Sequence, residues 1–203
     1  MSYLKPKSLA AQGCMKLGEC TEKVLPITSI DVLIDHYGED WLTPDHEQEV
    51  IALIDRLNAV GVHPYLASDF YFQVGVRGVY YTDINGLFMN EYYSRNIDAF
   101  LTVMRHEAWH AAQDCMAGTI DNTMMAIILD PDEIPNSVKM ITDIRYKFFA
   151  PSAIPWEQEA IYAGSTPNMT ADALNACAAG EMWTEYKPTP KTEEWLKEKG
   201  FMK

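Results

Sequence analysis

The spacing of hydrophobic and polar residues predicts both helices and strands in the first half of the chain. Hydrophobic side chains recur at helical intervals over residues 44–60, and a proline stands at the first turn, so we expect a helix there. Residues 62–67 and 71–81 are rich in β-branched and aromatic side chains, which favours strands. The Asn85-Gly86 pair between two such runs predicts a β-hairpin.

A long helix and several shorter ones are predicted to follow. Asn96 is typical of an N-cap, and Gly118 lies just beyond Met116, so we expect one helix from Asn96 to about Met116. Further helical patterns, separated by proline and glycine residues, lie near residues 120–129, 136–149, 155–164, 171–186 and 193–199. The chain is therefore expected to have an α+β fold with a small mixed or antiparallel sheet and a mostly helical C-terminal half.

Length and charge narrow the range of functions. The 203 residues suit a single domain over 1–203, with an N-terminal segment at 1–25, a core at 26–186 and a peripheral tail at 187–203. The net charge is −13. We therefore expect neither nucleic acid nor a membrane as a partner, unless a local basic patch overrides the total charge. The oligomeric state is left open.

Targeting signals and cysteines indicate the cellular location of the protein and the oxidation state of its thiols. The N-terminus lacks the hydrophobic segment of a signal peptide, and the longest purely hydrophobic run, Met124 to Leu129, is too short to span a membrane. We therefore expect a cytoplasmic protein. Its four cysteines are too few for a disulfide scaffold, so reduced thiols are expected.

The clearest chemical signal is the sequence His106-Glu107-Ala108-Trp109-His110, the HExxH pattern of zinc hydrolases. Residues four apart in a helix lie about 40° apart around its axis, so His106 and His110 can bind one metal ion. Glu107 can then act as general base toward a water molecule. Two histidines can also fall at this spacing by chance. The helix argues against chance, because both histidines point away from its hydrophobic stripe, formed by Leu101, Met104, Ala108, Ala111 and Cys115.

A catalytic zinc site needs a third protein ligand. His46 and His63 are possible, but neither continues the motif, and a carboxylate from a later helix is the better candidate. Glu157 and Glu159 stand near the start of the helix expected after Pro155, about 200° apart, so only one of them can face the metal. We expect Glu159 to be the ligand.

Two segments resemble the thermolysin-like gluzincin metallopeptidases. They are His106-Glu107-x-x-His110-Ala111-x-x-Asp114-x-x-Ala117-Gly118 and Glu159-Ala160-Ile161. The resemblance implies a zincin-like fold and one zinc ion bound by His106, His110 and Glu159, with Glu107 as general base. The family also has an aspartate, four positions after its zinc glutamate, that orients the first histidine. In this chain that position is Ala163.

Several residues could donate the hydrogen bond that stabilises the oxyanion. Tyr162 lies one turn from Glu159 and is the preferred candidate; His63, Arg145 and Tyr146 are others. The leading hypothesis is a zinc-dependent metallopeptidase that hydrolyses peptide or protein substrates. The alternatives are a metal-dependent hydrolase of a non-peptide amide or ester, and a non-catalytic binding or regulatory module with a zincin fold.

Overall fold

The computed structural model describes residues 9–20, 23–118, 120, 123–148, 150–187 and 192–200. The chain divides into two compact units, Met1–Met104 and Arg105–Lys203. The division falls within the long helix α4 (Ile97–Met116). The single domain expected over the whole chain stays a prediction.

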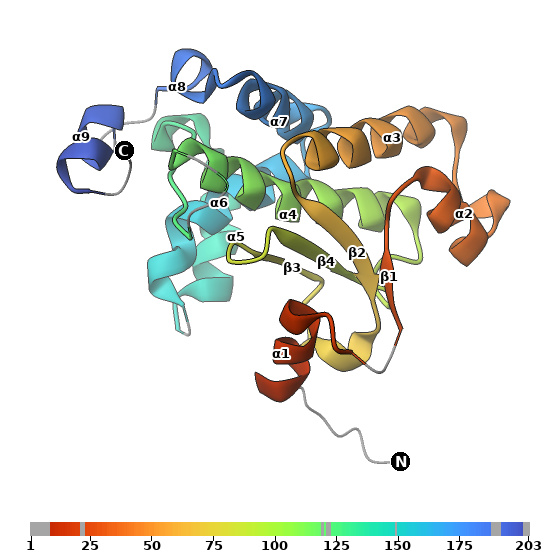
Figure 1. Cartoon of the computed structure of the whole chain (residues 1–203). Coiled ribbons are helices and arrows are strands. Elements are labelled where there is room, and N and C mark those ends of the chain that lie inside the picture. Colours follow the sequence, from red (N-terminus) through yellow and green to blue (C-terminus); the bar gives the residue numbers. More distant parts are fainter. Residues whose placement is uncertain are drawn as a thin grey trace. The chain divides into compact units, whose positions relative to one another are not determined.

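The first unit contains a small mixed sheet (Figure 1). Its strands are β1 (Val24–Pro26), β2 (His63–Ala67), β3 (Gly78–Tyr81) and β4 (Gly86–Asn90), in the order β1-β2-β4-β3. The pair β2 and β4 is parallel, whereas β1 and β3 run antiparallel to their neighbours. This arrangement confirms the predicted α+β class and the small mixed sheet.

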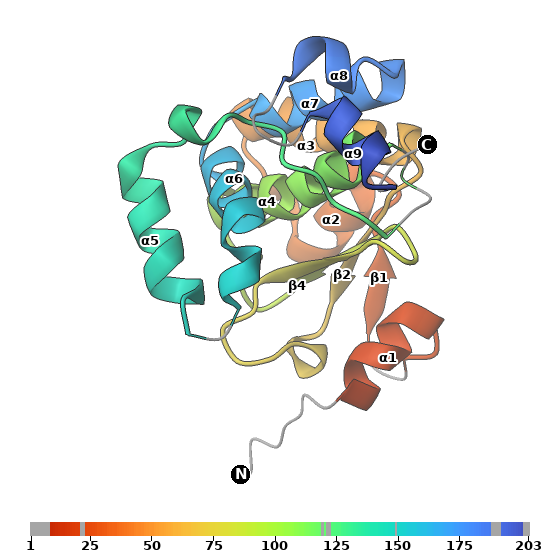
Figure 2. The same cartoon turned by 90° about the vertical axis from the view of Figure 1, so that its left-hand side faces the viewer.

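Three helices accompany the sheet in the first unit: α1 (Leu9–Leu17), α2 (Ile30–Tyr37) and α3 (Pro44–Ala59). The predicted helix over 44–60 is confirmed as α3, which begins with the proline and buries Val50, Leu53, Ile54 and Leu57. Helices α1 and α3 lie on opposite sides of the sheet (Figures 1 and 2). The sequence pattern did not predict α1, α2 or β1.

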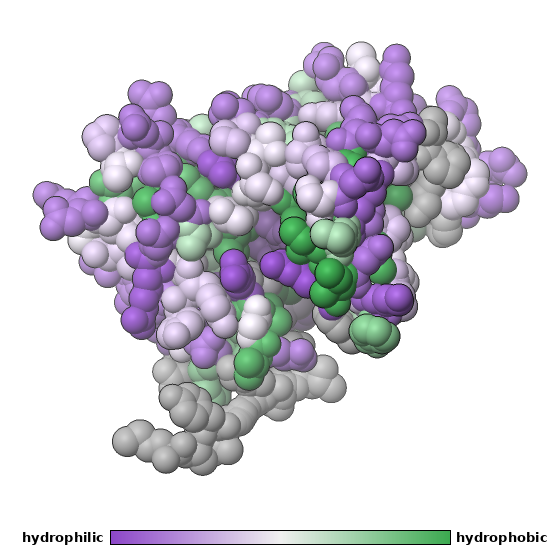
Figure 3. Space-filling model, turned by 180° about the vertical axis from the view of Figure 1, so that it is seen from behind, coloured by the Kyte–Doolittle hydropathy of each residue, from purple (hydrophilic) through white to green (hydrophobic). Residues whose placement is uncertain are grey.

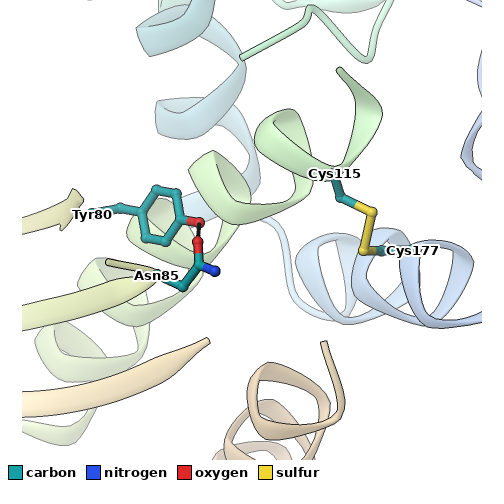
Figure 4. The surroundings of a disulfide bond; sticks show 4 residues. All are labelled: Tyr80, Asn85, Cys115 and Cys177. Carbon is teal, nitrogen blue, oxygen red and sulfur yellow. Dashed lines mark hydrogen bonds between the residues drawn. A yellow bond between two sulfur atoms is a disulfide. The ribbon is translucent and has the colours of Figure 1, made fainter. Parts of the chain in front are cut away.

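The predicted hairpin is confirmed, and its turn explains the Asn-Gly pair. Asn85 has a positive φ of 50°, and a Cβ atom at Gly86 would come within 2.8 Å of the Phe88 ring. The Tyr80 hydroxyl donates a hydrogen bond of 3.2 Å to Oδ1 of Asn85 (Figure 4). A side chain from β3 therefore supports the turn.

Helix α4 begins and ends where the sequence predicts. The Asn96 side chain accepts hydrogen bonds from the backbone N–H groups of Asp98 and Ala99, at 3.0 and 3.1 Å. These bonds satisfy donors that the first turn of a helix leaves free. Gly118, just after the helix, has a φ of 126°.

The second unit is helical after α4. Its helices are α5 (Asn136–Tyr146), α6 (Ile154–Gly164), α7 (Met169–Ala179), α8 (Met182–Glu185) and α9 (Glu193–Glu198). The described residues also include four 3-10 turns: Glu39–Trp41, Asp69–Tyr71, Pro131–Glu133 and Pro151–Ala153. The predicted helix over 171–186 is divided at Gly180, whose φ is 70°.

The helix predicted near 120–129 is wrong for the residues described there. Residues 124–128 have no regular secondary structure. The backbone N–H of Ala126 donates to the carbonyl of Gln113, and those of Ile128 and Leu129 donate to the Glu159 carboxylate. Because long-range partners take these donors, a local helix cannot form.

The expectation of reduced thiols is also wrong. Cys14 forms a disulfide with Cys20, and Cys115 forms one with Cys177. The second disulfide connects the last turn of α4 to α7 (Figure 4). Within the described residues, none of the helices is both long and hydrophobic enough to span a bilayer. The cytoplasmic location stays a prediction, and the disulfides argue against it, because they persist mainly in oxidising compartments.

Candidate metal centre

The two histidines of the HExxH motif lie one turn apart on α4, as the sequence predicts. Their ring centroids are 5.1 Å apart, and the ring planes are nearly perpendicular. His110 is buried, and the side chain of His106 is 20 % exposed. The pair is thus accessible from one side only.

Helix α6 supplies a carboxylate to this pair, and it belongs to Glu157. One carboxylate oxygen lies 3.4 Å from Nε2 of His106, and the other lies 3.6 Å from Nε2 of His110. In the described part of the chain, these three residues form a group that could hold a metal ion, with ligand atoms all within 4.8 Å of one another. A tetrahedral ion with bonds of 2.0–2.1 Å separates its ligand atoms by about 3.4 Å, which is close to the 3.4 and 3.6 Å between the carboxylate oxygens and the two imidazoles.

The Glu157 carboxylate has a second feature that fits a cation. Its Oε2 atom is buried and makes no hydrogen bond within the described residues, although it lies 3.4 Å from Nε2 of His106. Buried polar atoms are almost always hydrogen-bonded, so such an exception requires an explanation. A metal ion between Glu157 and the histidines would satisfy this atom. Two imidazoles and one carboxylate form a ligand set found in catalytic zinc sites.

Glu159, the expected third ligand, lies elsewhere. Its carboxylate is fully buried and accepts hydrogen bonds from Trp109 Nε1 (3.1 Å), Gln113 Nε2 (2.8 Å) and the backbone N–H groups of Ile128 and Leu129. The physical reason is the 200° separation anticipated between the two glutamates. Because Glu157 faces the histidines, Glu159 points into the protein interior.

Gln113 connects the buried carboxylate to the metal centre. Its Nε2 donates to Oε2 of Glu159 at 2.8 Å and to the carbonyl of Trp156 at 3.2 Å. With its amide nitrogen facing two acceptors, its Oε1 must accept the 2.8 Å hydrogen bond from Nδ1 of His110. The proton of neutral His110 is then on Nδ1, which leaves the Nε2 lone pair free for a metal.

His106 is oriented differently from the family pattern. The resemblance placed an aspartate at position 163, where this chain has a buried alanine. The groups beside His106 are instead the carboxylates of Glu157 and Glu107 and the backbone of Ala160, and of these the carboxylates contribute most to raising the pKa of the imidazole.

Glu107 lies beside the potential ligands without being one of them. Its side chain is 8 % exposed, and its Oε1 is 4.0 Å from Nε2 of His106. A carboxylate at this distance from a ligand atom can reach a water molecule bound at the same centre. The position suits the general base that the motif predicts.

A tyrosine also reaches the site, from α5. Tyr146 hydrogen-bonds to Glu157, and burial together with Glu157 and Glu107 raises the pKa of the phenol well above its usual value. The preferred candidate, Tyr162, is half-buried on α6. It lies about 140° around that helix from Glu157, so it stays a prediction without support from this geometry.

The other residues considered from sequence are not members of this group. His46 is near the start of α3, where its ring contacts Thr43 Oγ1 at 2.7 Å and Asp98 at 3.2 Å. His63 is the exposed first residue of β2. Arg145 is exposed on α5. Gln113 was not predicted, although its position one turn after His110 is a signal that could have indicated it.

The ionisable side chains of the site shift one another's pKa values. Burial would lower the pKa of His106, but Glu157 and Glu107 outweigh it and raise this pKa above its usual value. Burial and the nearby His106 lower the pKa of His110. Burial would raise the pKa of Glu157, but the two imidazoles hold it at about 2. At neutral pH the metal-free site therefore contains an ionised Glu157 and a neutral His110, and of the two imidazoles His106 is the one that binds a proton more readily.

Comparisons with known proteins give no family assignment. No protein family model matches the chain, and neither curated proteins nor solved structures give a significant match.

Proposed function

We propose that this protein is a zinc-dependent metallopeptidase. The observation that carries the proposal is the position of Glu107 next to the His106, His110 and Glu157 group, because a purely structural metal site has no use for a carboxylate that is not a ligand. The resemblance of the HExxH helix to gluzincins supports the same reaction class and a zincin-like fold. In this proposal Glu157, and not Glu159, is the glutamate ligand.

His106, His110 and Glu157 would hold one zinc ion. When bound, the ion supplies Lewis acidity, which lowers the pKa of a water molecule and polarises a carbonyl group. Glu107 accepts the proton of the attacking water and passes it to the nitrogen of the departing amine. The low exposure of Glu107 keeps its carboxylate poorly solvated, which favours proton transfer to it.

Tyr146 is the proposed hydrogen-bond donor to the oxyanion. Its raised pKa keeps the phenol protonated at neutral pH, so it remains a donor. Tyr146 contacts the carboxylate of Glu157, which would be a ligand in this proposal, so its hydroxyl is at the candidate centre. A donor of this kind contributes on the order of 100-fold in kcat.

The key experiment combines metal content with peptide cleavage. Zinc-loaded wild-type protein and Glu107→Gln are incubated with a peptide library, and the products are identified by mass spectrometry. We expect the wild type to cleave peptides and Glu107→Gln to lose at least about 1,000-fold in rate while it retains one zinc per chain. Glu181→Gln, an exposed glutamate on the same unit, is the matched control and should behave as wild type.

The same experiment separates the alternatives. A chain that binds zinc and cleaves no peptide, but hydrolyses amide or ester model substrates in a Glu107-dependent way, would be a non-peptide hydrolase. A chain that binds zinc without any turnover would be a non-catalytic module. Either result contradicts the proposed peptidase activity.

A further inference from the structure

Helix α5 and the turn that follows it expose a row of hydrophobic side chains. Met140, Ile141 and Ile144 on α5 are 60, 42 and 70 % exposed, and Phe148, two residues beyond the end of α5, is 89 % exposed. At 100° per residue they fall within an arc of about 100° around the helix. Figure 3 shows hydrophobic side chains gathered over this part of the second unit. Exposed hydrophobic residues are usually scattered singly, and a contiguous group of them marks an interaction surface.

The positive charges of this region are concentrated on the same helix. Between residues 106 and 186 the sequence has three lysines and arginines, Lys139, Arg145 and Lys147, against twelve aspartates and glutamates. On the α5 wheel, Lys147 lies about 20° beyond Met140, and Arg145 lies about 40° beyond Ile141. Cations therefore flank the hydrophobic row on both sides, with Asp143 between Lys139 and Lys147 on one of them. Residues 136–148 have a net charge of +2, within an otherwise acidic unit.

The shape and size of the row indicate what covers it. The four side chains expose on the order of 500 Å², less than the ~800 Å² per partner that a stable protein interface buries. The row lies on a helix at the edge of its unit (Figure 2), and a second copy would bring like charges together. A flat anionic surface with a hydrophobic interior fits better, because it accepts hydrophobic side chains and places its charges at the level of the flanking cations.

We propose that α5 docks this protein on the surface of anionic lipid bilayers. Hydrophobic insertion and the attraction between the flanking cations and anionic headgroups act together in such contacts. The net charge of −13 opposes approach to the membrane, but at physiological salt charges more than about 8 Å from the surface are screened. The three cations therefore form a local basic patch that opposes the negative total charge at this face.

Docking through this face leaves the proposed catalytic centre free. Tyr146 lies on the opposite side of α5, about 180° from the middle of the hydrophobic row. Its phenol contacts Glu157 on α6. The inference does not depend on the proposed peptidase activity, since none of the docking residues belongs to the metal centre.

Vesicle flotation of the full chain tests the proposal. One set of vesicles is made of phosphatidylcholine and a second of phosphatidylcholine with phosphatidylserine. We expect at least about tenfold more protein bound to the second set, and a decrease as sodium chloride is raised. The double variant Ile144→Asp/Phe148→Asp and the triple variant Lys139→Gln/Arg145→Gln/Lys147→Gln should each reduce binding by about tenfold or more.

A matched control places the same charge on exposed hydrophobic residues elsewhere. Leu17 and Val74, 71 and 94 % exposed, lie in the first unit, and Leu17→Asp/Val74→Asp should float as wild type. Absence of flotation with phosphatidylserine, or equal binding of the wild type and both α5 variants, would overturn the proposal. It would also be overturned by light scattering that shows a dimer lost in Ile144→Asp/Phe148→Asp without any vesicle binding, because a second copy would then cover the row.

Discussion

The amide nitrogen of Gln113 donates a 2.8 Å hydrogen bond to the fully buried carboxylate of Glu159. This bond determines which way the amide points, so the Gln113 oxygen faces Nδ1 of His110. Glu159 therefore orients the residue that hydrogen-bonds to His110, a potential ligand of the candidate metal centre.

Replacing Gln113 should weaken metal binding without removing a ligand. Gln113→Leu removes the acceptor for His110 and one donor to Glu159, so we expect a 10–100-fold loss of zinc affinity. The free energy of unfolding should also fall by about 1–3 kcal/mol, because a buried carboxylate loses a hydrogen bond. Competition with a chromophoric chelator measures the affinity. Gln48→Leu, at an exposed glutamine, is the control and should keep the wild-type zinc affinity. Equal zinc affinity in the two variants would contradict a connection from Gln113 to the metal site.

Glu157 and Glu159 should respond to mutation in opposite ways. Glu157→Ala should retain less than about one tenth of the zinc, because a ligand is lost, and should remain folded. Glu159→Gln places an amide N–H₂ among four N–H donors, so it should lose about 2–5 kcal/mol of stability. Its folded fraction should still bind one zinc. Elemental analysis with urea unfolding distinguishes the two, and a metal-free but stable Glu159→Gln would show that Glu159 is the ligand.

Metal binding should release a proton near neutral pH. The neighbouring carboxylates raise the pKa of His106, so this imidazole holds a proton that a metal ion must displace. Below that pKa the proton competes with the metal, and zinc affinity falls as pH falls; above it the affinity levels off. Calorimetry at pH 6, below the ordinary pKa of histidine, in buffers of different ionisation enthalpy should detect most of one proton released per zinc. Release of no proton at pH 6 would show that the pKa of His106 is not raised.

The two disulfides should contribute unequally to stability. Cys115 and Cys177 are 62 residues apart, and Cys14 and Cys20 are 6 apart. Closing the longer loop removes more entropy from the unfolded chain, which gives about 4 kcal/mol for the first pair and about 2 kcal/mol for the second. Cys177→Ser and Cys20→Ser, each compared with the oxidised wild type in urea unfolding, measure these contributions. A larger loss in Cys20→Ser would contradict this order.

The sequence was sufficient for the features that depend on local rules. Asn96 and Pro44 indicated where α4 and α3 begin, and the spacing of His106 and His110 placed two ligands on one face. Elements stabilised by distant partners were not predictable in the same way. The sequence predicts a helix over residues 126–129, but backbone N–H groups in this segment donate hydrogen bonds to a carbonyl and a carboxylate far away in the sequence.

The pattern of small, buried residues on α6 already distinguishes Glu157 from Glu159. On α6, Glu159 lies about 40° from Ala163, within the buried stripe of small residues that also includes Ala160. Glu157 lies at the edge of that stripe, where a side chain can reach a partly open site. The resemblance to gluzincins favoured Glu159 instead, because it matched the order Glu-Ala-Ile.

The ligand set is tested most directly by X-ray absorption at the zinc K-edge of wild-type protein loaded with one equivalent of zinc. The geometry predicts two imidazole nitrogens and carboxylate or water oxygens at about 2.0–2.1 Å, without sulfur. In Glu157→Ala loaded in the same way, this signal should be lost. A sulfur ligand near 2.3 Å, a single imidazole, or an unchanged spectrum in Glu157→Ala would contradict a centre built from His106, His110 and Glu157.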